Sequence, residues 1–220
     1  MYKIPRRLGL SYGSLAFFIA ILHNVFLIYH VQTFVSVYKI SKWSFWIGEF
    51  VFLIWNSVND PLFGYLSDRG ILAGRTISKS DIVGNRVQHL YFYGPLMAVA
   101  FLSFWFSWTY PVVQFIVCLC LYDGFLTMVD LHHSALLADL AISMKARTIL
   151  NSYCSVFSCL GSVSVLISYF VWHQDRLQSF QIFCFCLSIL SFMGFLFSAN
   201  ILKNFISLQK KQEKNQESSM

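Results

Sequence analysis

Charged residues are scarce in this sequence. Only 12% of its 220 residues are Asp, Glu, Lys or Arg, whereas soluble domains carry about 25%. Hydrophobic residues make up 57% of the chain, aromatic residues make up 18%, and the mean hydropathy is +0.60. Too few polar side chains remain to cover the surface of a soluble domain. The composition therefore predicts a membrane protein whose main partner is the lipid bilayer.

Catalytic and metal-binding sets are also missing. The six histidines are too few for a membrane di-iron site, although Asp130, His132, His133 and Asp139 lie close together in the sequence. All six cysteines fall within apolar stretches, where cysteine usually packs as a small apolar residue. No nucleophile and base can be paired. We therefore expect no enzymatic activity, no metal site and no organic cofactor.

Six apolar stretches are long enough to cross a bilayer, which takes about 20 residues of helix. They are Leu8–Phe34, Trp43–Leu66, Leu90–Trp108, Pro111–Ala138, Thr148–Trp172 and Phe180–Leu202. The sequence thus predicts an all-α membrane protein with a bundle of six transmembrane helices over 1–202. In the fifth stretch, Ser158, Gly161 and Ser162 favour close helix packing. The polar tail, 203–220, is predicted to be disordered.

Basic residues gather on one side of the predicted bundle, which sets its orientation. With the N-terminus inside, the cytoplasmic side holds Lys3, Arg6, Arg7, Arg69, Arg75, Lys79, Arg86, Lys145, Arg147, Lys203, Lys210, Lys211 and Lys214. The outer side holds only Lys39, Lys42 and Arg176. Short loops rich in Lys and Arg stay in the cytoplasm, so we expect both termini there, in the plasma membrane rather than an internal one. The net charge of +6 forms no basic face, which argues against a nucleic-acid partner.

Carboxylates lie inside two of the predicted spans, and none of the six spans contains a Lys or Arg. The second span holds Glu49 and Asp60, and the fourth holds Asp123 and Asp130. A charge within a bilayer usually faces a cavity or a partner. Without a basic partner, these carboxylates must bind a cation, hold a proton or face water.

Helical periodicity favours a single shared site. At 100° per residue, Asn56 and Asp60 share one face of the second span, and Asp123 and Asp130 share one face of the fourth. Asp60 and Asp130 also lie at similar depth, so together they could provide oxygen ligands for sodium or hold a proton.

Simpler readings of these residues remain open. Asp60 could sit at the membrane interface beside Pro61, and Glu49, nearer the outer surface, is more typical of an interfacial residue. His23 and His30 share a face of the first span and could line a pore, although a hydrogen-bonded packing role is more usual for such histidines.

One run of the sequence, WNSVNDPLFGYLSDR from Trp55 to Arg69, resembles the glycoside–pentoside–hexuronide cation symporters of the major facilitator superfamily. Those transporters carry a similar NDP-x-x-G run at the end of helix 2. The stretches ILHNVFLIYHVQTFVSVYKI and LCLYDGFLTMVDLHHSALLADL extend the resemblance to the superfamily over the first and fourth spans. The resemblance implies the N-terminal half of a twelve-helix fold, built as two inverted three-helix repeats.

The resemblance also implies roles for particular residues. Asp60 and Asp130 would be acidic cation ligands, Asn56 a neutral ligand where the family has a second aspartate, and Asp123 would line the cavity. A second set would form the motifs of the inner gate, in the loops that follow helices 2 and 4. This gate set comprises Gly64, Asp68, Arg69, Asp139 and Arg147.

The expected function is symport of a small polar solute, such as a carbohydrate, with sodium or a proton. The chain would then act as a half-length form of a transporter. The alternative is a truncated or regulatory membrane protein that does not transport and instead pairs with a full-length relative. A second copy of the chain is the other partner that could supply the opposing wall.

Overall fold

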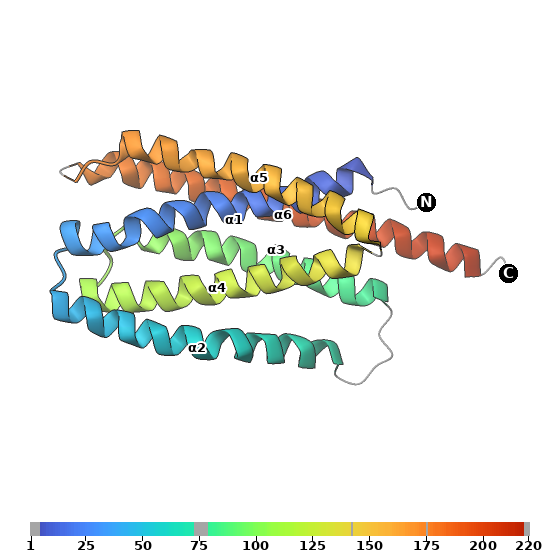
Figure 1. Cartoon of the computed structure of the whole chain (residues 1–220), viewed down its shortest axis with the longest axis horizontal. Helices are drawn as coiled ribbons and strands as arrows, with labels where there is room; N and C mark the ends of the chain where they lie inside the picture. The colour runs from blue at the N-terminus through green and yellow to red at the C-terminus, as the bar shows by residue number, and fades with distance from the viewer. Residues whose placement is uncertain (1–4, 73–78, 142, 175, 218–220) are drawn as a thin grey trace.

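The computed structural model describes residues 5–72, 79–141, 143–174 and 176–217, with the side chains of 68–72, 79–80 and 209–217 left out. Its helices are α1 (Arg6–Gln32), a π-helical turn (Thr33–Val37), α2 (Lys42–Leu72), α3 (Lys79–Ser103), α4 (Pro111–Leu140), α5 (Met144–Val171) and α6 (Leu177–Glu217). Successive α-helices run in opposite directions, so both termini lie at one end of the bundle (Figure 1). The all-helical fold class is confirmed.

Four of these helices are long and apolar enough to cross a membrane. Within the described residues they are Arg6–Val37, Pro111–Leu140, Met144–Val171 and Leu177–Leu208. The other two, α2 and α3, are of comparable length but carry more polar residues. The chain is therefore a membrane protein with four candidate spans, and the crossing of α2 and α3 stays a prediction.

Two helix boundaries differ from the sequence prediction. The third helix begins at Lys79 and ends at Ser103, rather than spanning 90–108, because its first turns are amphipathic: Val83 and Val87 are buried among polar neighbours. The predicted disordered tail is instead helical over 203–217, because α6 continues to Glu217. Lys, Gln and Glu are good helix formers, and neither Gly nor Pro follows Gly194.

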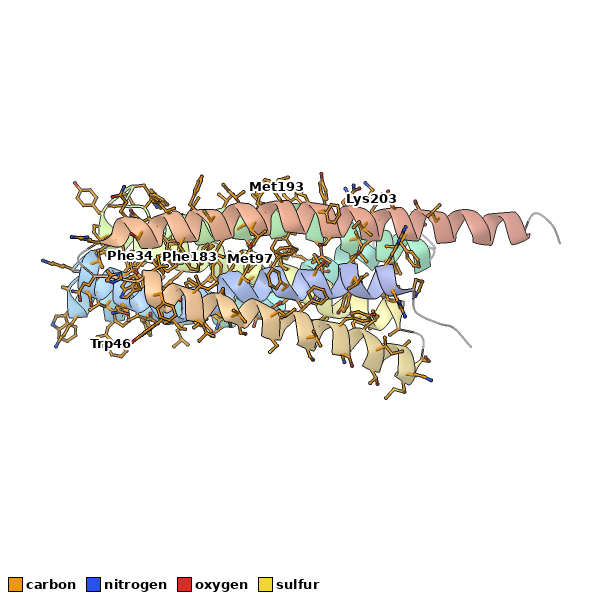
Figure 2. All side chains as sticks on the ribbon, turned by 90° about the horizontal axis from the view of Figure 1, so that it is seen from above. Phe34, Trp46, Met97, Phe183, Met193 and Lys203 are labelled. Carbon is orange, nitrogen blue, oxygen red and sulfur yellow. The ribbon has the colours of Figure 1, made fainter. Side chains whose placement is uncertain are left out.

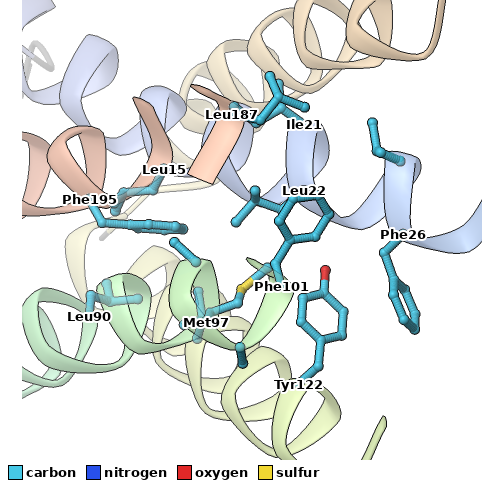
Figure 3. Close-up of a cluster of buried hydrophobic side chains, with 14 of the residues drawn as sticks. Leu15, Ile21, Leu22, Phe26, Leu90, Met97, Phe101, Tyr122, Leu187 and Phe195 are labelled. Atoms are coloured by element: carbon cyan, nitrogen blue, oxygen red, sulfur yellow. The ribbon is translucent and has the colours of Figure 1, made fainter. Parts of the chain in front are cut away.

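The apolar core lies where four helices meet. In the bundle α1 packs on α5 and α6, α3 packs on α4 and α6, and α2 packs mainly on α4. Leu22 of α1, Met97 and Phe101 of α3, Tyr122 of α4 and Phe195 of α6 converge in this core (Figure 3). Because α2 rests chiefly on one neighbour, much of its surface remains exposed, including Asn56, Ser57 and Asp60 near its middle.

Small residues bring α1 and α5 close together. A Cβ atom added at Gly161 would lie 2.8 Å from Cβ of Ala20 and 3.0 Å from the backbone oxygen of Phe17. Beside this contact, Asn24 Nδ2 donates a hydrogen bond of 2.9 Å to Ser162 Oγ. The predicted packing role of the small-residue patch on α5 is therefore confirmed at Gly161 and Ser162.

The outer surface is apolar, as a lipid-facing surface must be. Large hydrophobic side chains such as Leu166, Phe170 and Met193 are 59–77% exposed, and Met193 and Trp46 project away from the bundle in Figure 2. Soluble monomers rarely expose contiguous apolar surface on this scale. The exposed apolar side chains therefore support placement in a bilayer.

Candidate functional site

Hydrogen bonds join α2 to α4 through a line of four polar side chains. Asn59, which is fully buried, donates from Nδ2 to Asp123 Oδ2 at 2.8 Å and to Thr127 Oγ1 at 3.2 Å. The Thr127 hydroxyl in turn donates to Asp60 Oδ1 at 3.1 Å. We call Asp60, Thr127, Asn59 and Asp123 the polar row. It links two carboxylates through one hydroxyl and one amide.

Local helix geometry explains why these residues meet. On α4, Thr127 follows Asp123 by one turn, so both point to the same side of the helix. On α2, Asn59 faces α4 while Asn56 and Asp60 lie exposed at the flank. Gly48 aids the approach of the two helices, because a Cβ there would lie 2.7 Å from the Phe115 ring.

The predicted site residues are only partly brought together. Asp60 and Asp123 share the polar row, but Asn56 makes no hydrogen bond among the described residues and the buried Asn59 is used in its place. Asp130 lies two turns beyond Asp123 on α4, about 10 Å along the helix axis. It is exposed and has no hydrogen bond or ion pair within the described part of the chain.

A cavity of about 170 Å³ lies beside the polar row, between α1, α2 and α4. Its ionisable lining residues are His23, His30, Glu49 and Asp123, and Tyr122 adds a phenol. The rest of its lining is apolar: Phe26, Leu27, Phe52, Leu119 and Leu126. Asp123 therefore belongs to both the polar row and the cavity.

Glu49 and the two histidines are the residues that sequence reasoning undervalued. Glu49 lines the cavity rather than only the interface, and His23 and His30 line it together from one face of α1. His30 also makes the expected packing contact, with Nδ1 2.9 Å from the Phe26 carbonyl oxygen. The sequence pattern that points to this cavity is a pair of histidines seven residues apart in the first span together with a glutamate in the second span, which contains no Lys or Arg.

The predicted gate residues are arranged differently from the expectation. Asp139 lies in the last turn of α4, not in the following loop, and its Oδ2 is 2.7 Å from Nε of Arg86 on α3. Arg147 lies in the first turn of α5 and is exposed. The placement of both in a loop was wrong because the two helices are separated by only 141–143.

The other gate motif ends α2. Nothing lies within 4 Å of a Cβ added at Gly64, so this glycine has open space beside it among the described residues. Asp68 and Arg69 belong to the helical backbone of α2, but their side chains lie outside the described ones.

The remaining α4 histidines pack against aromatic rings. His132 is 1% exposed and stacks on His89 with ring centroids 4.3 Å apart. His133 stacks on Tyr12 at 4.3 Å, and the Tyr12 hydroxyl donates to the His133 carbonyl oxygen at 3.0 Å. Among the described residues, no three His, Cys, Asp or Glu side chains are grouped to hold a metal ion.

A helical bundle with an apolar exterior and polar groups between its helices defines an integral membrane protein. The family described as MFS/sugar transport protein matches residues 11–220, and the chain belongs to this family. The major-facilitator resemblance of the sequence is thereby confirmed.

Two curated relatives are similar over most or all of the chain. Transmembrane protein 180 of Gallus gallus is 56% identical over 224 residues, covering 100% of this chain and 44% of that protein. Transmembrane protein 180 of Mus musculus is 55% identical over 209 residues, covering 93% of this chain and 40% of that protein. The chain thus spans less than half the length of these relatives.

Proposed function

We propose that this chain contributes the cation-binding half of a symporter that moves a small polar solute with sodium or a proton. The observation that carries the proposal is the polar row. It gathers two carboxylates, a hydroxyl and an amide at a depth where the predicted spans contain no Lys or Arg. Hard oxygen ligands of this kind suit sodium, and a paired carboxylate suits a proton.

The chemistry of the row assigns a role to three of its four members. Asp60 and Asp123 would supply negative charge to the ion. Asn59 Oδ1 has no hydrogen-bond partner among the described residues, so it remains available as a neutral oxygen ligand. Asn56 and Asp130, both exposed, would complete the site from its open side, as the family resemblance implies.

The helix contacts support two inverted three-helix repeats, α1–α3 and α4–α6. The symmetry would relate α1 to α4, α2 to α5 and α3 to α6. Under this relation the observed α1–α5 contact corresponds to the α4–α2 contact, which is also observed. Under the same relation the α3–α4 contact corresponds to the α6–α1 contact. Such symmetry is typical of one half of a major-facilitator fold, in which the solute lies between two halves. The solute class, including carbohydrate, remains part of the proposal.

Gate and orientation belong to the same proposal. Gly64, Asp68 and Arg69 would brace the cytoplasmic end of α2, and Arg86–Asp139 would hold α3 to α4 at that end. Both termini would be cytoplasmic in the plasma membrane, which is consistent with their lying at one end of the bundle (Figure 1).

Ion-dependent stability tests the proposed cation site. The purified chain in detergent is unfolded thermally with increasing sodium, against potassium, at several pH values. A ligand at 100 times its Kd stabilises the folded state by about 2.7 kcal/mol, so sodium should raise the Tm and Asp60→Asn should remove the effect. Glu49→Gln, outside the polar row, is the control and should keep it. A Tm insensitive to sodium and pH, or a full sodium shift in Asp60→Asn, contradicts the proposal.

The alternative is a regulatory protein that does not transport and pairs with a longer relative. The exposure of Asp60 and Asp130 along α2 and α4 favours a covering surface from another chain. Co-expression of tagged versions would test this pairing. Recovery of a stoichiometric complex, together with no ion response of the chain alone, would favour the regulatory function.

A further inference from the structure

The cavity between α1, α2 and α4 has a lining of one charge sign. Glu49 enters from α2 and Asp123 from α4, while none of its ten lining residues is Lys or Arg. Its other ionisable groups are the imidazoles of His23 and His30. Two half-buried carboxylates with no Lys or Arg in the same lining are costly unless a cation or protons neutralise them. The lining therefore selects against anions.

Aromatic rings form one wall of the cavity. Phe26 lies between His30, at a centroid distance of 4.3 Å, and Tyr122, at 4.5 Å. Figure 3 shows the Phe26 and Tyr122 rings beside each other at the edge of the core. Aromatic faces attract organic cations, and the leucines around them suit a hydrocarbon group. A bare metal ion would make no favourable contact with this apolar part of the lining.

Two polar groups of the lining lack partners. Tyr122 is 1% exposed, yet its hydroxyl has no hydrogen-bond partner among the described residues. His23 Nδ1 is likewise buried and without a partner there. A buried polar group left unbonded costs about 1–3 kcal/mol. A ligand that brings several N–H donors can bond to such groups as well as to a carboxylate, which favours a primary ammonium over a quaternary one.

The volume limits the ligand. An apolar protein cavity of about 150 Å³ holds one benzene molecule, and this cavity measures about 170 Å³. A ligand of about six to eight non-hydrogen atoms therefore fits. A disaccharide does not fit this cavity.

We propose that this cavity binds a small primary ammonium ion with a short apolar body, held by Glu49 and Asp123. In this arrangement the ammonium group lies against the Glu49 carboxylate, Asp123 adds negative charge to the same lining, and the apolar body rests on Phe26 and Phe52. The inference rests on the proposed function only in taking this ion as the transported solute. Binding itself requires no transport, although Asp123 belongs to both the cavity and the polar row.

Benzylammonium is the probe, with benzyl alcohol and benzoate as neutral and anionic matches of similar shape. Binding to the purified chain in detergent is measured by calorimetry. We expect benzylammonium to bind at least tenfold more tightly than either match. Glu49→Gln, which keeps the shape of the side chain, should weaken benzylammonium binding at least tenfold. Glu213→Gln, the same change of side chain on the polar end of α6 and outside the cavity, should leave it unchanged.

Several outcomes would overturn the inference. Equal binding of benzyl alcohol, measured on the unaltered chain, would show that charge plays no part, whether or not Glu49→Gln folds. Undiminished affinity in Glu49→Gln, or no binding at all, would also overturn it. The sodium response of the same preparation separates the two proposals. A sodium shift without ammonium binding overturns only this inference, and ammonium binding without a sodium shift overturns only the coupling.

Discussion

Asn59 and Asn56 lie three residues apart on α2 but in opposite environments. Asn59 is fully buried and bonds to both Asp123 and Thr127, whereas Asn56 is exposed and has no hydrogen bond within the described residues. The difference follows from which side of α2 faces α4. The polar row therefore depends on one buried amide that holds two α4 side chains in place.

Replacing Asn59 should destabilise the protein, and replacing Asn56 should not. In Asn59→Ala the half-buried Asp123 and Thr127 side chains lose their hydrogen-bond donor, which costs about 1–3 kcal/mol in the free energy of unfolding. Asn56→Ala removes an exposed side chain and should change it by less than about 0.5 kcal/mol. Denaturant unfolding in mixed micelles measures both variants. Equal losses would mean that Asn59 is not the residue that joins α2 to α4.

Sequence reasoning found the carboxylates of the site but not their shared partner. Unpaired acids within apolar stretches are visible in the sequence because their cost in a bilayer is large. Asp60 and Asp123 can be identified on this ground. The rotation of α2 about its axis depends on contacts such as Gly48 with Phe115, which connect distant parts of the chain. Periodicity alone could therefore not choose Asn59 over Asn56.

At the scale of helices, hydropathy predicted the apolar central segment of each helix better than it predicted the residues at which the helix begins and ends. The central segments of α1, α4, α5 and α6 match the predicted spans closely. The prediction missed the amphipathic start of α3 and the polar helical end of α6, because neither is a continuous apolar run. Helix propensity and one-sided burial extend a helix beyond the residues that face lipid.

Replacing Gly161 tests whether the close approach of α1 and α5 at this residue stabilises the protein. An alanine methyl there meets Ala20 and the backbone of Phe17, so the helices must separate. We expect Gly161→Ala to lower the free energy of unfolding by about 1–3 kcal/mol. The matched control is Gly84→Ala on α3, where nothing lies within 4 Å of the added carbon among the described residues. Its stability should stay the same or rise by about 0.5–1 kcal/mol.

Thermal unfolding of both glycine variants in the same detergent gives the comparison. Adding Ala20→Gly to Gly161→Ala removes the nearer of the two contacts and should restore part of the loss. If Gly161→Ala behaves like Gly84→Ala, close approach at this position does not contribute to the α1–α5 interface.

At the scale of the whole molecule, α2 and α3 decide how the chain crosses the bilayer. At about 1.5 Å per residue, the 31 residues of α2 extend about 46 Å, more than the roughly 30 Å hydrocarbon core. The helix lies along α4, which is itself a candidate span. Its polar residues then face the proposed site instead of lipid, which explains why α2 is less apolar than its neighbours.

If all six helices cross, successive connections must alternate between the two sides of the membrane. Lys42 at the start of α2 should be outside, while Lys79 at the start of α3 and Lys145 at the start of α5 should be inside. Single cysteines at these positions are labelled with a membrane-impermeant maleimide on intact cells and again after permeabilisation. The native cysteines, all within helices, set the background. We expect Lys42→Cys to react in intact cells and the other two only after permeabilisation.

Reaction of Lys79→Cys in intact cells together with Lys42→Cys would show that α2 and α3 return to the outer side without crossing. The reverse pattern at all three positions would show that the positive charge of the loops does not set the orientation.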